Sequence, residues 1–70
     1  MIPLSVAPVG EGLLVLRIGG NPETKKHLEN LGFVPGSEVT IVTAMEGNII
    51  VKVKEARVAI SKEMACKIMV

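Results

Sequence analysis

Apolar and polar residues alternate along several short segments of the chain, and this alternation predicts β-strands. Successive side chains of a strand point to opposite faces, so a period of two marks a strand with one buried face. The pattern predicts strands at residues 13–18, 38–44, 49–54, 57–60 and 68–70. Glycine, proline and asparagine fall between several of these segments, as is typical of tight turns.

Two of the predicted strands divide cleanly into two faces. In residues 49–54, three aliphatic residues are expected to point inward, and Lys52 and Lys54 outward. In the strand at residues 38–44, Val39, Ile41 and Thr43 are expected to share one face, and Thr40 and Val42 the other. Before this strand, the sequence Val34-Pro35-Gly36-Ser37 predicts a type II turn, because proline suits its second position and glycine its third.

The first predicted strand, residues 13–18, is apolar on both faces. One face carries Leu14, Leu16 and Ile18. The other face is only half polar, so something must cover part of it; its residues are Leu13, Val15 and Arg17.

A helix is predicted at about residues 22–31. Asn21-Pro22-Glu23 is a favourable start, because asparagine caps free backbone N–H groups, proline suits the first turn and glutamate complements the helix dipole. Gly32 is placed to end the helix in a left-handed conformation. Phe33 is then expected to pack back on Leu28.

These elements together predict a mainly β fold. Ser61 is expected to cap a short helical turn at about residues 62–66. About five short strands in 70 residues suit a small, strongly bent partial barrel. A helical turn between the fourth and fifth strands is typical of SH3-like barrels. We therefore predict one domain, residues 1–70, with an SH3-like partial barrel and one inserted α-helix.

Composition excludes several classes of function. Eight Lys and Arg residues face seven Asp and Glu, and a net charge of +1 gives no basic excess for nucleic acid. The longest apolar run, residues 13–16, is far below the ~20 residues that span a bilayer, and the N-terminus lacks the basic start of a secretory signal. Phe33 is the only aromatic residue, which excludes the aromatic groove that binds proline-rich peptides. We expect a cytoplasmic protein without membrane insertion or cofactor.

Catalytic groups are scarce in this sequence. Cys66 is the only cysteine and His27 the only histidine, and tyrosine and tryptophan are absent. One cysteine excludes an internal disulfide and fits a reducing compartment. A nucleophile needs an activating base and a third group that orients the base. We expect no enzymatic activity.

A metal site has incomplete support. Glu23 and His27 are four residues apart on the predicted helix and could bind one ion together. Cys66 and Glu63 are three apart on the short helical turn. Neither pair is a complete site. The alternative is that His27 borders the buried face of the helix and that Cys66 is a small core or boundary residue.

Protein binding is favoured because the chain is rich in aliphatic residues that so small a fold cannot all bury. Candidate residues of an apolar groove are Leu13, Val15, Val42, Met45, Met64 and Met69. Lys26, His27 and Asn30 on the outer helix face could rim this groove. Ordinary core filling is the alternative for the apolar residues, and a weak homo-oligomer is a further expectation.

The sequence resembles the FeoA family of ferrous-iron-transport accessory proteins over nearly its whole length. The matching segments, in order, are residues 4–5 (LS), 7–12 (APVGEG), 19–20 (GG), 28–39 (LENLGFVPGSEV), 58–65 (VAISKEMA) and 68–70 (IMV). The most specific segment is residues 31–37, LGFVPGS.

This resemblance implies an SH3-like barrel with an inserted helix. It also implies a cytoplasmic role beside FeoB, the membrane transporter of ferrous iron, which the protein would bind and modulate. The same barrel occurs as a C-terminal domain of iron-dependent repressors. Two alternatives therefore remain: a small metal-binding carrier or sensor, and an SH3-like regulatory domain related to that of the repressors.

Overall fold

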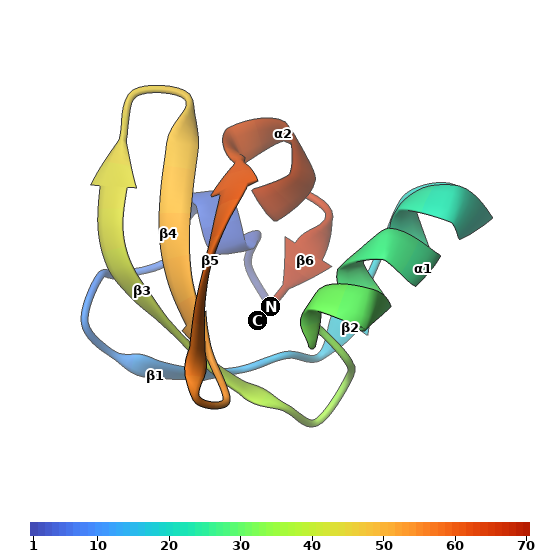
Figure 1. Ribbon diagram of the computed structural model, residues 1–70, viewed down its shortest axis with the longest axis horizontal. Helices are drawn as coiled ribbons and strands as arrows, with labels where there is room; N and C mark the ends of the chain where they lie inside the picture. Colours follow the sequence, from blue (N-terminus) through green and yellow to red (C-terminus); the bar gives the residue numbers. More distant parts are fainter.

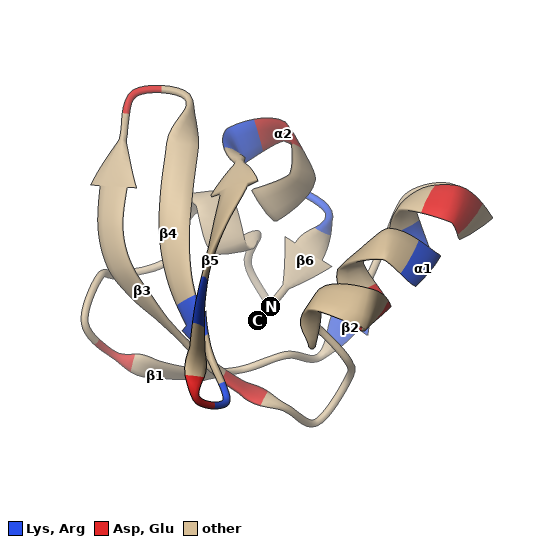
Figure 2. Cartoon of the chain, viewed as in Figure 1, with Lys and Arg blue, Asp and Glu red and all other residues tan.

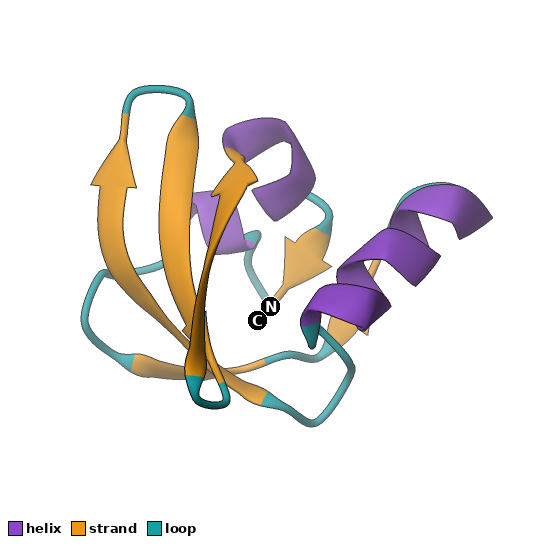
Figure 3. Ribbon diagram, in the orientation of Figure 1, coloured by secondary structure: helices purple, strands orange, loops and turns teal.

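The chain folds into six short strands and three helical segments in a computed structural model that describes residues 1–70 (Figures 1 and 3). The elements in order are a 3-10 helix η1 (Leu4–Val6), β1 (Gly12–Leu14), β2 (Arg17–Ile18), α1 (Pro22–Leu31), β3 (Glu38–Met45), β4 (Asn48–Val53), β5 (Ala56–Ser61), α2 (Lys62–Ala65) and β6 (Ile68–Met69). No helix is long and apolar enough to cross a lipid bilayer.

The strands form two antiparallel sheets. The main sheet has four strands in the order β1-β3-β4-β5, and the second pairs β2 with β6. The main sheet bends around the core, with α2 and β6 beside it and α1 projecting on one side (Figure 1). The predicted mainly β barrel with one inserted helix and a short helical turn is confirmed. It has six strands rather than about five, because the first predicted strand is divided.

Residues 13–18 do not form a single strand, and the prediction for their faces is wrong. Leu13 pairs with Val39 of β3, whereas Arg17 pairs with Met69 of β6. The chain passes from one sheet to the other at Val15. There the Val15 N–H donates to the carbonyl of Ser37 (2.9 Å), and the Leu16 N–H to that of Met69 (2.8 Å).

This passage changes which side chains are buried. Val15 is only 1% exposed, whereas Leu14 and Leu16 are 53% and 49% exposed. Ile18, expected on the same face as these two leucines, is buried at 7% exposure. A continuous alternation cannot hold where the backbone changes sheets, and an apolar sequence contains no signal of that change.

Helix α1 has the predicted ends. The side chain of Asn21 accepts a hydrogen bond from the Thr24 N–H at 2.8 Å, which caps the first turn. Gly32 has φ 106°, and the N–H of Phe33 donates to the carbonyl of Leu28 at 3.0 Å. The Gly32 N–H donates to the carbonyl of Glu29, also at 3.0 Å, which completes a Schellman end.

Strand β3 departs from the predicted alternation at a β-bulge. Ile41 pairs with Val51, but Thr43 pairs with Ile50, so Val42 is an extra residue in the ladder. Val42 and Thr43 are both exposed. The prediction that Thr43 shares a face with Val39 and Ile41 is therefore wrong, because the bulge changes the register between Ile41 and Thr43.

The core is wholly aliphatic except for Phe33. Fourteen hydrophobic residues are buried, and no polar or charged residue is. The prediction for β4 is confirmed, since Ile49, Val51 and Val53 are buried and both lysines are exposed. The two chain ends close the barrel, because Ile2 and Val70 exchange two backbone hydrogen bonds of 2.9 and 2.8 Å.

Candidate functional site

The outer face of α1 carries three of the six predicted partner-binding residues. Lys26, His27 and Asn30 are all exposed, and Leu28 is the one fully buried residue of this helix. Acidic and basic residues are interspersed along α1 (Figure 2), so the helix presents a mixed charge rather than one sign. The structure thus brings these three residues together on one accessible element.

The other three predicted residues lie elsewhere. Met45 is 49% exposed at the end of β3, next to the β3–β4 turn. This turn lies on the opposite side of the molecule from α1 (Figure 1). Leu13 and Met64 are half-buried and pack against the core. Val15 is buried, so the prediction that it lines a surface groove is wrong. The six residues therefore do not form one continuous surface.

The candidate metal ligands are dispersed as well. Glu23 and His27 are exposed on α1, whereas Cys66 follows α2, where its Sγ lies 3.2 Å from Oγ of Ser5 in η1. Nowhere do three or more His, Cys, Asp or Glu side chains converge in a way that could hold an ion. The contact between Ser5 and Cys66 links the two helical turns at this end of the barrel.

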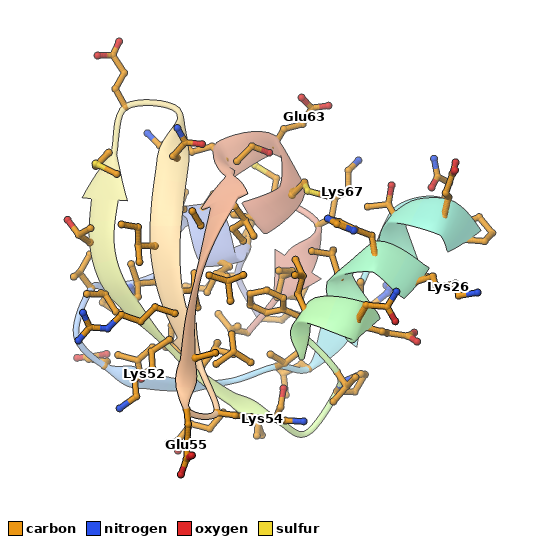
Figure 4. All side chains as sticks on the ribbon, in the orientation of Figure 1. Lys26, Lys52, Lys54, Glu55, Glu63 and Lys67 are labelled. Carbon is orange, nitrogen blue, oxygen red and sulfur yellow. The ribbon has the colours of Figure 1, made fainter.

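A polar hollow lies on the outer face of the main sheet, and sequence reasoning did not identify it. It is open to solvent, has a volume of about 340 Å³ and is lined only by Glu38, Thr40, Lys52 and Lys54. Figure 4 shows Lys52 and Lys54 at the end of the sheet where the β4–β5 turn lies, with Glu55 projecting beyond it.

The strand register places a third cation beside this hollow. Lys52 pairs with Thr40 on one side and directly with Arg57 of β5 on the other. Figure 2 shows the basic positions of β4 and β5 side by side. Like charges directly opposite each other in a sheet are destabilising. We call Glu38, Thr40, Lys52, Lys54 and Arg57 the sheet face. Its signal in the sequence is the two-residue turn at Lys54 and Glu55, which fixes Lys52 opposite Arg57.

Apolar side chains flank the sheet face. Leu14 of β1 is paired with Glu38 and is exposed. On the neighbouring strands, the half-buried Ile50 is paired with the exposed Ala59, two positions along from Lys52 and Arg57. The surface therefore combines cations with accessible aliphatic groups, which is a composition suited to contact with another protein.

Comparison with known proteins gives one family. The family model described as FeoA domain matches residues 2–70. A protein of Methanocaldococcus jannaschii, described as an Fe(2+) transport protein A, is 31% identical over 70 residues, which is 100% of this chain and 85% of that protein.

Solved structures agree with this match. The crystal structure of an iron uptake regulatory protein, FeoA, is 31% identical with a TM-score of 0.89, covering 97% of this chain and 90% of that one. The FeoA of Stenotrophomonas maltophilia, a prokaryotic SH3 domain protein solved with zinc, is 25% identical with a TM-score of 0.84, covering 99% and 88% of the two chains.

The fold also occurs within a repressor. A manganese-dependent transcriptional repressor has a TM-score of 0.86 at 23% identity, and the match covers 94% of this chain but only 38% of the repressor. This likeness shows a common fold.

Proposed function

The chain belongs to the FeoA family of ferrous-iron transport, and on this premise we propose that it is a cytoplasmic accessory protein that binds and modulates a FeoB-type transporter. The single observation that carries the proposal is the family match over residues 2–70. The related S. maltophilia protein is described as a candidate activating factor of bacterial ferrous iron transport, which supports a modulating role.

The protein acts by binding rather than by catalysis. His27 is exposed on α1 and has no side-chain hydrogen bond, while the hydroxyl of Ser5 and the thiol of Cys66 contact each other on different elements. A binding protein modulates a transporter when it has different affinities for two conformations of that transporter. Modulation by this chain is then a shift of the transporter toward the conformation that it binds more tightly.

The exposed residues of α1 are the first candidates for contact. Lys26, His27 and Asn30 share an accessible helix face, and Met45 offers a flexible apolar side chain at the other side of the barrel. Leu13 and Met64 would contribute through the parts of their side chains that the core leaves accessible.

Binding to the cytoplasmic region of the cognate FeoB transporter tests this proposal. We expect saturable binding by isothermal titration calorimetry and, on 15N-labelled protein, chemical-shift changes that include the exposed residues of α1. Gly32→Ala, which is expected to be partly unfolded at 37 °C, is the control for fold-dependent binding and should bind more weakly than the wild type at that temperature. Absence of binding by the folded protein would contradict the proposed function, whereas binding that leaves residues 26, 27, 30 and 45 unchanged would contradict only the proposed contacts.

A second function is favoured by the zinc complex of the S. maltophilia relative. In this alternative the chain is a small metal-binding carrier or sensor that uses His27 with Glu23, or Cys66. Since no three candidate ligands converge within one chain, a complete site would need a second copy or water ligands. Zinc and ferrous-iron titrations of the wild type and His27→Ala test it, and equal weak affinity in both proteins would remove it.

A further inference from the structure

We propose that the sheet face is a docking site for an acidic segment of the protein partner, whose carboxylate groups occupy the hollow beside Lys52, Lys54 and Arg57. This inference rests on the proposed function and adds a second contact surface to the outer face of α1. The occupant is defined by its chemistry: a segment in which carboxylate side chains alternate with aliphatic ones.

The first reason is an uncompensated like-charge pair. Lys52 and Arg57 are direct cross-strand neighbours, and such neighbours have Cβ atoms about 5 Å apart. Folding brings these two cations together, and their repulsion destabilises the folded state. The fold does not need this pair of charges, because both side chains are exposed and neither contributes to the core. A carboxylate between them would add two attractive interactions that offset this repulsion.

The second reason is the distribution of charge over the molecule. The sheet face holds three of the eight Lys and Arg residues but only one of the seven acidic residues, Glu38. Its net charge is therefore +2, whereas the remaining five cations and six acids leave the rest of the chain at −1. A partner segment of negative charge is thus attracted more strongly to this face than to the rest of the surface taken as a whole.

The third reason is the shape and composition of the hollow. Its lining has no hydrophobic residue, and the ammonium groups of Lys52 and Lys54 and the hydroxyl of Thr40 can all donate hydrogen bonds to a carboxylate. The carboxylate of Glu38 also lines the hollow and reduces the net charge of its lining to +1. The guanidinium of Arg57 offers a paired donor geometry that suits carboxylates. The volume of about 340 Å³ is enough for one or two acidic side chains.

A protein segment fits better than nucleic acid. Nucleic-acid surfaces combine many cations with stacking aromatic residues, and the sheet face has three cations and no aromatic residue. The accessible Leu14 and Ile50 beside it provide apolar contacts that a phosphate backbone would not use. These neighbours favour a segment that carries aliphatic side chains next to its carboxylates.

Charge reversal at Lys52 is the decisive test, since Lys52→Glu places opposite charges across the strands and is expected to fold as well as the wild type. Lys62→Glu is the matched control, because Lys62 is exposed on α2 at the far end of β5 and gives the same change of net charge. We expect Lys52→Glu to weaken binding to the cytoplasmic region of the cognate FeoB on the order of tenfold. Lys62→Glu should change it less than twofold, and the difference should shrink as salt is raised.

Each outcome has a distinct meaning. If the wild type does not bind, the proposed function fails, and this inference fails with it. If the wild type binds and Lys52→Glu binds equally well, or if Lys62→Glu is weakened to the same extent, this inference alone is overturned. A short DNA duplex is the last probe: if the wild type binds it at the same salt concentration and Lys52→Glu does not, the face is a general polyanion site and the inference is likewise wrong.

Discussion

Replacement of Gly32 by alanine should destabilise the protein through two separable effects. Gly32 has φ 106°, a conformation that costs an L-residue about 1–2 kcal/mol. In addition, a Cβ at this position would lie 2.8 Å from Cγ1 of Val53, which is buried at 2% exposure. Overpacking in a well-packed core costs typically ~1–3 kcal/mol. We therefore expect Gly32→Ala to lower the free energy of unfolding by about 3 kcal/mol, adding the two effects.

A loss of this size is critical for so small a domain. Cores of this length rarely supply more than ~3–5 kcal/mol, so the variant should be partly unfolded at 37 °C. Urea unfolding followed by far-UV circular dichroism is the suitable assay, because the chain contains neither tryptophan nor tyrosine for fluorescence.

Gly36→Ala provides the matched control for backbone strain. Gly36 has a similar φ of 92°, but nothing lies within 4 Å of the Cβ that would be added there. Gly36→Ala should therefore lower the free energy of unfolding only by the cost of the backbone conformation, about 1–2 kcal/mol.

The steric part can be isolated with a second variant. Because Val53→Ala removes the atom that clashes, the double variant Gly32→Ala/Val53→Ala should cost less than the sum of the two single changes, by ~1–3 kcal/mol. Equal losses for Gly32→Ala and Gly36→Ala, together with additivity in the double variant, would refute the steric explanation.

Three further predictions concern local features of the fold, each measured by the same urea unfolding. Asn21→Ala should cost about 1 kcal/mol because α1 loses its cap, and Asn21→Ser should restore most of it; equal losses for both would contradict a capping role. Val15→Ala should lower the free energy of unfolding by about 2 kcal/mol, and Leu16→Ala by less than about 0.5 kcal/mol. A single strand over residues 13–18, as the sequence predicts, would reverse this order. Lys54→Gly should raise the free energy of unfolding by about 0.5 kcal/mol, because Lys54 has a φ of 57°, which glycine adopts without strain. A clear decrease would show instead that the Lys54 side chain stabilises the turn.

The parts of the fold that the sequence predicts correctly depend on local chemistry. The cap at Asn21, the left-handed Gly32 and the turn at residues 34–37 follow from residue types whose backbone preferences are strong. The alternation in β4 is equally reliable, because one face of this strand meets the core and the other meets water.

The errors arise where partners distant in the sequence decide the structure. Val15 is buried because Ser37 and Met69 bind the backbone on either side of the passage between sheets, and no local pattern identifies those partners. Val42 is an extra residue because the register of β3 against β4 shifts at this point, and the residue types of β3 do not specify where such a shift occurs. Lys52 was expected to face water, but the surface that it forms with Arg57 depends on the pairing of two strands.

The hydrogen bonds between Ile2 and Val70, with the bridge between Pro3 and Met69, also impose an order on folding. Bringing together residues so far apart in the sequence costs about 4 kcal/mol of loop-closure entropy, whereas the hairpins β3–β4 and β4–β5 close short loops. On the ribosome, these hairpins can pair early, but the barrel can close only after Val70 has emerged. A circular permutant that joins the paired ends through a short linker would make the slowest contacts local, and it should fold faster than the natural order of the chain.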